Sequence, residues 1–560
     1  MFSKAKSVWS TLALGARKAS TEEVNPFFTF TSGRWLCNNK AQVNSRYTPF
    51  NVDGLQRVAS RVMGSQVQSM EKMAESLNRV FLLKFQNGEQ VIARIPTPLS
   101  GPAHFSTASE VATMDFLGRL GIPVPKVLAW SSRAQSTEVE SEFIIMEKAD
   151  GVPLIKIWDT VDQVDLVTKL AQLHRPLLDL RFTHYGSLYY KSDVDVSHAS
   201  TTDFLETIPA GLDISPFCMG PIARRDFWEN ERISMEVNRG PWASALEYMV
   251  DVVVREQTWI DRYATPHVHD DFLCGLPLQG KQDDHIELLE YYKYMLPDLV
   301  PEDRRYLCGH LWHPDLHAAN LFVVPSGPAT ADEKIQANIT SCIDWQGAWV
   351  GAAFLQLTVP VMFRALGAGP EALNLPPHFE TLDADTRKEA ERFHNEAVLN
   401  KLFETLTLPD IAQLPALAER RGLEDLAQGT WRTGLLPFRE ILIKVMKQWS
   451  DIAGPGKKCP VDFTPAECEE HAEAYAYWAK HRARAAALDE EFSLDEFGYV
   501  AGDEAHFLSV QAQLEKRRKE WIASGNTNEE RMVKAVLWPY RDTLLDNPRS
   551  HLMVDTKTLC

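Results

Sequence analysis

Paired cysteines are missing from this sequence. Its eight cysteines are scattered along the chain, with no C-x-x-C pair and no regular spacing. This pattern excludes a disulfide framework and does not indicate a zinc site. We therefore expect reduced, structural thiols in an intracellular compartment.

Long hydrophobic runs and clustered positive charge are also lacking. The least polar stretch, residues 347–363, is interrupted by Gln356 and Pro360, so we interpret it as buried core and predict no transmembrane segment. The formal net charge of −18 argues against nucleic acid as a partner, because such binding requires clustered Lys and Arg. With 560 residues, 45% of them hydrophobic, the chain can bury a large core.

Acidic residues are absent before Glu22, whereas basic residues and Ser are frequent there. Wound as a helix, this segment places its apolar residues on one face. A basic, Ser-rich, acid-free amphipathic start is typical of a mitochondrial transit peptide. We predict such a peptide at residues 1–23, and the alternative is a disordered leader.

The next residues divide into segments of different pattern. Residues 24–73 show no clear periodicity, so we predict a wrapping segment. Residues 74–150 are predicted to form a small lobe, because two β-branched runs meet at the hairpin turn Asn87-Gly88 and a helix and a strand follow. Helical patterns dominate residues 151–545, and residues 546–560 are predicted to form a tail.

The central region carries a polar loop between two strand-like runs. The loop extends from His313 to Asn320, and the second run, residues 339–343, leads into Asp344. Phosphoryl transfer needs a carboxylate near the acceptor hydroxyl, oxygen ligands for magnesium and a cation on the nucleotide phosphates. Asp315 is the candidate base, and Asn320 with Asp344 can offer an amide oxygen and a carboxylate to one Mg²⁺ ion.

Residues 311–324, with Ile-Asp-Trp-Gln at 343–346, resemble the aminoglycoside phosphotransferase and choline-kinase superfamily, whose pattern is H-x-D-x-x-x-x-N followed by I-D-W/F. The resemblance covers roughly residues 75–350. It implies that a linker after Met146 holds adenine through the Glu147 carbonyl and the Ala149 amide. It also implies a kinase-like α+β fold with ATP and Mg²⁺ between its lobes.

The basic leader, together with residues 90–96 and Ile-Asp-Trp-Gln-Gly at 343–347, more closely resembles the fungal mitochondrial phosphotransferase-like proteins named for altered inheritance of mitochondria. This resemblance implies mitochondrial localisation.

A cation for the phosphates is expected at Arg94, where protein kinases place a lysine and choline-kinase-like proteins an arginine. Glu110 is predicted to pair with Arg94. The alternative is that Glu110 forms a capping box with Thr107 at the start of the helix.

The sequence allows two interpretations for each of several further side chains. His313, grouped with Asp315 at the catalytic centre, is either a structural residue of the loop or a proton shuttle, and His317 either packs or contacts the metal side. His267 and His269, with two adjacent acids, form either an exposed polar turn or a metal cluster. A group of aromatic residues either packs in the core or lines an acceptor pocket: Tyr185, Tyr189, Phe227 and Trp228.

We therefore predict a bilobal protein-kinase-like fold, with a small antiparallel-sheet lobe and a large, mainly helical lobe. The predicted function is ATP-dependent phosphotransfer to a hydroxyl of a small-molecule acceptor. Two departures motivate the alternative of a mitochondrial pseudokinase that binds or scaffolds: residues 75–78 contain no glycine to fold over phosphates, and Pro314 changes the loop. AMP transfer or simple ATP hydrolysis is a third possibility.

Overall fold

The computed structural model describes residues 25–73, 77–195, 197–265, 280–326, 334–365, 370–495 and 497–540. The predicted leader and tail, the pair His267 and His269, and residues 75–76 of the glycine-free stretch lie outside these residues. Within the described ranges, no helix combines the length and the apolar character needed to cross a membrane.

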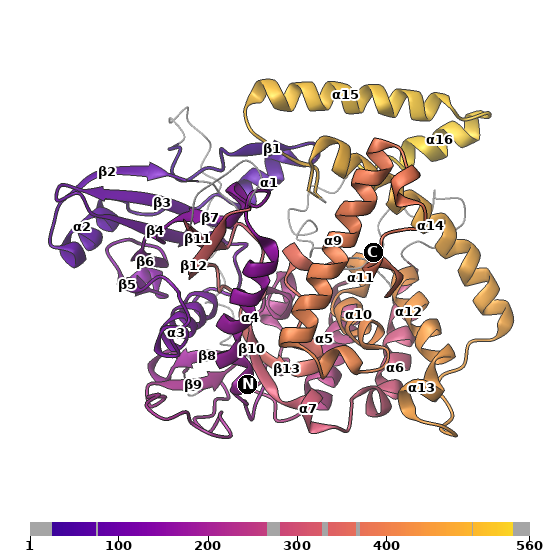
Figure 1. Cartoon of the computed structure of the whole chain (residues 1–560), viewed down its shortest axis with the longest axis horizontal. Helices are drawn as coiled ribbons and strands as arrows, with labels where there is room; N and C mark the ends of the chain where they lie inside the picture. Colours follow the sequence, from indigo (N-terminus) through magenta and orange to yellow (C-terminus); the bar gives the residue numbers. More distant parts are fainter. Residues whose placement is uncertain are drawn as a thin grey trace, which may run out of the picture.

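The small lobe is built on a five-stranded antiparallel sheet in the order β2-β3-β4-β6-β5, at the left of Figure 1. The hairpin predicted at Asn87-Gly88 is confirmed, and Gly88 has the left-handed φ of 87° that the turn requires. The strands are β2 (Val67–Lys72), β3 (Asn78–Phe85), β4 (Gln90–Pro96), β5 (Val127–Ser131) and β6 (Phe143–Glu147).

Alternation along the strands gives the sheet two buried faces. Phe81 of β3 and Ile145 of β6 belong to a core that includes Leu55 of helix α2 (Val52–Met63). Ile144 and Met146 point to the other face, into the core shared with helix α3 (Phe105–Arg119) and the large lobe. The sheet therefore connects the small lobe to the rest of the molecule through α3.

Two expectations for this region differ from the structure. Strand β2 lies inside residues 24–73, which we predicted as a wrapping segment, yet it pairs with β3. The helix predicted to begin near Thr107 is confirmed and begins at Phe105, but the capping box is wrong. The hydroxyl of Thr107 instead donates to Glu142 Oε2 at 2.6 Å, and the His104 amide donates to Glu142 Oε1 at 2.8 Å.

The large lobe is mainly helical and surrounds three small antiparallel sheets. The helical and strand-like patterns predicted after residue 151 are confirmed, which confirms the α+β class and the bilobal kinase-like architecture. Its strands are β7 (Val152–Pro153), β8 (Ser187–Tyr190), β9 (Phe217–Gly220), β10 (Gly309–Trp312), β11 (Leu321–Ser326), β12 (Gln336–Cys342) and β13 (Trp349–Ala352). Its helices are α4 (Gln163–Asp179), α5 (Ala245–Tyr263), α6 (Gln282–Leu299), α7 (Arg304–Leu307), α8 (Ala353–Gln356), α9 (Ala384–Thr407), α10 (Leu417–Ala427), α11 (Thr430–Thr433), α12 (Leu435–Lys447), α13 (Trp449–Ala453) and α14 (Pro465–Phe492).

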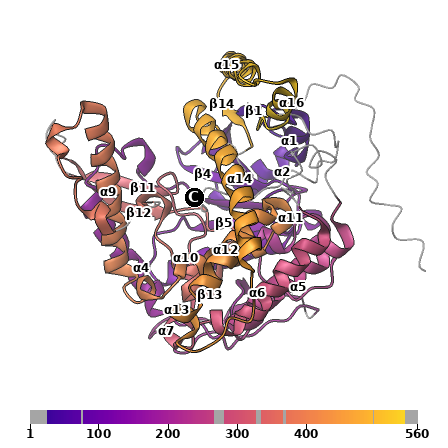
Figure 2. The ribbon, with the colours of Figure 1, turned by 90° about the vertical axis from the view of Figure 1, so that its right-hand side faces the viewer.

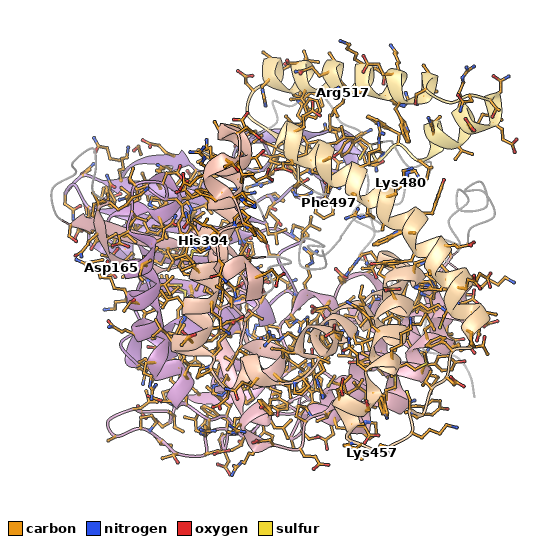
Figure 3. All side chains as sticks on the ribbon, turned by 45° about the vertical axis from the view of Figure 1, so that its right-hand side comes forward. Asp165, His394, Lys457, Lys480, Phe497 and Arg517 are labelled. Atoms are coloured by element: carbon orange, nitrogen blue, oxygen red, sulfur yellow. The ribbon has the colours of Figure 1, made fainter. Side chains whose placement is uncertain are left out.

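The C-terminal part of the chain returns to the N-terminal part. Helix α14 leads from α12 toward strand β14 (Tyr499–Ala501), as Figure 2 shows, and β14 pairs with β1 (Gly33–Trp35). Figure 3 labels Arg517, which lies on helix α15 (Glu504–Ala523). The Nη2 atom of Arg517 lies 2.6 Å from Glu491 Oε1 at the end of α14. The remaining helices are α1 (Asn39–Ser45), α15 (Glu504–Ala523) and α16 (Asn528–Val536).

Candidate active site

The polar loop predicted to carry chemistry joins β10 to β11, and His313 holds it in shape. The Nδ1 atom of His313 accepts the Asp315 amide at 3.1 Å, and its Nε2–H donates to the Ile343 carbonyl at 2.9 Å. Burial lowers the pKa of His313 to about 4, so the ring is neutral at pH 7. Both nitrogens bind backbone, which supports the structural interpretation over a proton shuttle.

Asn320 closes the other end of the loop. Its Nδ2 donates to the Asp315 carbonyl at 3.0 Å, and its own carbonyl accepts the Ile343 amide at 3.0 Å. Because the amide nitrogen is used within the loop, Oδ1 is the side-chain atom suited to a cation. His313 and Asn320, at the two ends of the loop, therefore both bind the backbone of Ile343, the residue before Asp344.

His317 lies between the two polar residues of the loop. Its Nε2 atom is 3.6 Å from Asp315 Oδ2 and 3.3 Å from Asn320 Nδ2, and its Nδ1 accepts the Ala319 amide at 3.2 Å. The sequence favours packing within the loop for this residue. With 38% of its side chain exposed, it is better described as a polar neighbour of Asp315.

Asp344 follows β12 in a left-handed conformation, with φ of 66°. Asp tolerates this region better than most residues, and such conformations are often found at functional sites. The carboxylate faces the small lobe, where Oδ1 lies 3.3 Å from Arg94 Nη1, and 43% of the side chain is exposed. The predicted metal ligand and the predicted phosphate cation thus meet across the two lobes.

Arg94 lies on β4 and pairs with Glu110 of α3, as one of the two interpretations of Glu110 predicted. The Arg94 side chain is 10% exposed and that of Glu110 is 1% exposed. Burial lowers the pKa of Arg94, whereas the nearby carboxylate of Asp344 raises it. An arginine stays charged under such a shift, so the cation persists beside Asp344.

The predicted adenine-binding linker leaves the sheet at the end of β6. Met146 is buried between Ile92 and Val127 on the neighbouring strands, and the Glu147 amide donates to the Lys126 carbonyl at 3.0 Å. Ala149 follows the strand and is half-buried. The adenine contacts of Glu147 and Ala149 remain predictions.

Beyond the linker, the chain packs directly on the catalytic hairpin. Val152 of β7 pairs with Val323 of β11, the strand that follows Asn320. Gly151, with φ of 87°, lies so close to β11 that an added Cβ would come within 2.3 Å of the Val323 carbonyl oxygen. The linker and the loop therefore share one rigid support.

Sequence reasoning missed Gln346, which turns toward the small lobe two residues after Asp344. Its Oε1 accepts Asn78 Nδ2 at 2.7 Å, and its Nε2 donates to the Ser100 carbonyl at 2.5 Å. An amide two residues after a predicted metal ligand was the only signal in the sequence. Its partners are distant in the sequence and could not be foreseen.

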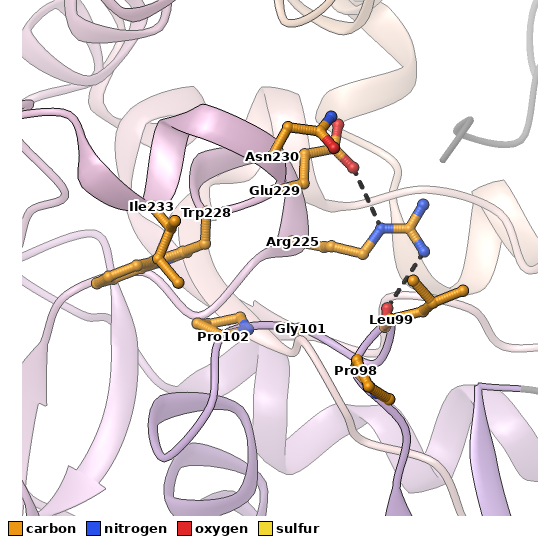
Figure 4. Close-up of a pocket in the computed structure, with 9 residues that line it drawn as sticks. All are labelled: Pro98, Leu99, Gly101, Pro102, Arg225, Trp228, Glu229, Asn230 and Ile233. Atoms are coloured by element: carbon orange, nitrogen blue, oxygen red, sulfur yellow. Dashed lines mark hydrogen bonds and ion pairs between the residues drawn. The ribbon is translucent and has the colours of Figure 1, made fainter. Parts of the chain in front are cut away.

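The aromatic residues considered for an acceptor pocket are core residues, the interpretation we favoured: Tyr185, Tyr189, Phe227 and Trp228 are all at most 9% exposed. Trp228 also borders a cavity of about 170 Å³ between the β4–α3 connection and residues 225–233 (Figure 4). There, Arg225 Nη1 donates to the Leu99 carbonyl at 3.4 Å and its Nε lies 3.4 Å from Glu229 Oε2. None of the residues predicted to act as the base or to bind ATP or Mg²⁺ lines this cavity.

A metal site made of three or more His, Cys, Asp or Glu side chains is not found in the described part of the chain. The predicted magnesium ligands, Asn320 and Asp344, form a different kind of donor set. It consists of one amide oxygen and one carboxylate, both hard oxygen donors, and magnesium commonly combines so few protein ligands with phosphates and water. The donor chemistry therefore fits Mg²⁺.

One relative found by comparison with known proteins carries the name of the second resemblance. No family model matches the chain. A subtelomeric hrmA-associated cluster protein of Aspergillus fumigatus is 29% identical over 84% of this chain and 96% of its own length. The mitochondrial altered inheritance of mitochondria protein 9 of Yarrowia lipolytica is 24% identical over 81% of each chain. Among solved structures, an amicoumacin kinase in complex with AMP-PNP matches 78% of this chain and 94% of its own at 13% identity, with a TM-score of 0.33.

Proposed function

We propose that this chain is an ATP-dependent phosphotransferase that moves the γ-phosphoryl group of ATP to a hydroxyl of a small-molecule acceptor. The observation that carries the proposal is that the loop of Asp315 and Asn320 is hydrogen-bonded to Ile343, next to Asp344, whose carboxylate lies 3.3 Å from the buried Arg94. Phosphoryl transfer requires a carboxylate near the acceptor, oxygen ligands for the metal ion and a cation at the phosphates.

Each residue has one role in this proposal. Asp315 orients the acceptor hydroxyl and accepts its proton while the new O–P bond forms and the bond to the β-phosphate oxygen breaks, releasing ADP. Arg94 neutralises phosphate charge, and His313 keeps Asp315 in place. Asn320 and Asp344 would hold Mg²⁺, which when bound supplies further positive charge at the phosphates.

The direct test compares the wild-type protein with Asp315→Asn in an assay of ATP consumption over a panel of hydroxyl compounds. We expect turnover in the wild type and a loss to background in the variant, because asparagine cannot accept the proton. Asp213→Asn, an exposed aspartate with 62% of its side chain accessible, is the matched control and should keep full activity. Equal rates for wild type and Asp315→Asn would contradict the mechanism.

A pseudokinase is the second candidate, and the glycine-free residues 75–78 favour it. Thermal unfolding with millimolar Mg-ATP separates the two. Stabilisation that disappears in Asp344→Ala supports a nucleotide site, whereas no shift in the wild type favours a scaffold. Phosphorus NMR of the products then distinguishes phosphoryl transfer from AMP transfer and from hydrolysis.

We also propose that the protein acts in mitochondria. The basic, acid-free residues 1–23 and the mitochondrial name of the Yarrowia lipolytica relative support this. Deleting residues 2–20 should leave a tagged protein outside mitochondria, whereas deleting residues 546–560 should not. Unchanged import after the first deletion would refute the proposed targeting role.

A further inference from the structure

The start of β3 and the connection from β4 to α3 are tied together by buried polar groups. The Leu77 carbonyl accepts the Thr97 amide at 3.1 Å and the Thr97 hydroxyl at 2.7 Å, and the Ser100 hydroxyl contacts the same oxygen. Asn78, Thr97 and Ser100 are all at most 8% exposed. These bonds therefore hold the start of β3 and the residues after β4 together as one unit. Strand β4, which carries Arg94, is part of this unit.

Gln346 of the large lobe binds this unit at two points. Its Oε1 accepts Asn78 Nδ2 at 2.7 Å, while its Nε2 donates to the Ser100 carbonyl at 2.5 Å and to the Ser106 hydroxyl at 3.3 Å. One side chain thus reaches the first strand of the hairpin, the connection after it and the first turn of α3.

The residue between Asp344 and Gln346 fixes both of them to the large lobe. Trp345 is 1% exposed, its indole Nε1 donates to the Cys342 carbonyl at 3.2 Å, and its ring lies 4.6 Å from that of His313. Asp344 and Gln346 therefore emerge from one anchored turn, and both face the small lobe.

We propose that Gln346 is a positioning residue that clamps the small lobe onto the turn of Asp344 and so fixes Arg94 relative to the metal-side carboxylate. This inference rests on the proposed function, because the geometry it preserves is that of the nucleotide phosphates. Both polar atoms of the Gln346 side chain are engaged by Asn78, Ser100 and Ser106, so its role would be exerted through Arg94 and Asp344. Charge-neutralising groups are effective only when held in place before the substrate arrives.

The test uses Gln346→Glu at pH 8. Glutamate keeps an acceptor for Asn78 but replaces the donor by an oxygen that faces the Ser100 carbonyl. We expect the Kd for Mg-ATP to rise about tenfold, the effect of losing one buried hydrogen bond and leaving an acceptor unpaired. Amide hydrogen exchange of residues 77–82 and 97–104 should also become faster, because both segments lose the same clamp.

Gln356→Glu is the matched control. Gln356 is also half-buried, and its Nε2 donates to a backbone carbonyl, that of Trp349, at 2.6 Å. The same chemical change there should lower the melting temperature similarly. It should leave the Kd for Mg-ATP and the exchange of residues 77–82 unchanged.

A double-mutant cycle provides a second measurement. If Asn78→Ala and Gln346→Ala weaken Mg-ATP binding through their shared bond, the double variant loses less than the product of the two single effects. The proposed clamp would be overturned if the effects of Asn78→Ala and Gln346→Ala on Mg-ATP binding were independent. It would also be overturned by unchanged amide exchange in Gln346→Glu, even if the protein binds Mg-ATP. If the wild type binds no Mg-ATP, the proposed function fails, and the role assigned to Gln346 in that function fails with it. Faster amide exchange in Gln346→Glu would still show that Gln346 holds the two lobes in contact.

Discussion

Glu110 contacts the guanidinium of Arg94 inside the small lobe, and only 1% of its side chain is exposed. A buried arginine without its carboxylate is costly, because the charge is left in a medium that solvates it poorly. The pair therefore binds α3 to β4 as much as it prepares a cation for phosphates.

Glu110→Gln should accordingly lower the free energy of unfolding by about 3 kcal/mol, measured by urea denaturation. Glu138, which bridges Arg57 and Arg61 at the surface, provides the control. Glu138→Gln should change stability little, since water replaces the exposed bond. Similar losses in the two variants would show that burial of the Arg94–Glu110 pair does not determine its contribution.

Three buried histidines should make the protein less stable in mild acid. Burial lowers the pKa of His174 to about 3 and the pKa of His310 and His313 to about 4, against an ordinary value of 6.5. Between pH 6.5 and pH 4 the unfolded chain binds these protons and the folded chain does not. The stability that these neutral histidines contribute is therefore complete above pH 6.5, and this contribution should fall as the pH decreases, by about 1.4 kcal/mol per pH unit for each histidine.

The variant His313→Gln isolates the contribution of one histidine to this pH dependence of stability. Between pH 6 and 5, the slope of unfolding free energy against pH should be about 1.4 kcal/mol per unit smaller than in the wild type. An unchanged slope would mean that His313 is protonated in the folded protein.

The two glycines with φ of 87° allow a matched comparison. An added Cβ at Gly88 meets nothing within 4 Å, whereas at Gly151 it would come within 2.3 Å of the Val323 carbonyl oxygen. Both alanine variants carry about 1–2 kcal/mol of backbone strain. Gly151→Ala should lose clearly more stability and also activity, because β11 supports Asn320. Equal melting temperatures for the two variants would contradict the close packing of linker and strand.

The sequence predicted the elements whose signals are local. The hairpin at Asn87-Gly88 has turn chemistry that works without tertiary partners, and the loop from His313 to Asn320 is defined by residue spacing. The capping box was wrong because Thr107 and Glu110 have the right types and spacing but bind Glu142 and Arg94, which lie far away in the chain. Tertiary contacts replaced the local one.

Other features had almost no local signal. Strand β2 has only half-buried and exposed residues, and it is an edge strand whose pairing with β3 determines its conformation. The role of Gln346 depends on Asn78 and Ser100, each more than 240 residues away. Such relationships follow from packing the two lobes together, which no pattern within one segment encodes.

The pairing of β1 with β14 has a consequence for how the chain is made. Gly33–Trp35 leaves the ribosome well before its partner Tyr499–Ala501, which follows several hundred residues later in the chain. At ~5–20 residues per second, that partner follows roughly 20–90 s later. Strand β1 therefore stays without its partner while the residues between the two strands are synthesised, and this small sheet can form only after β14 has emerged.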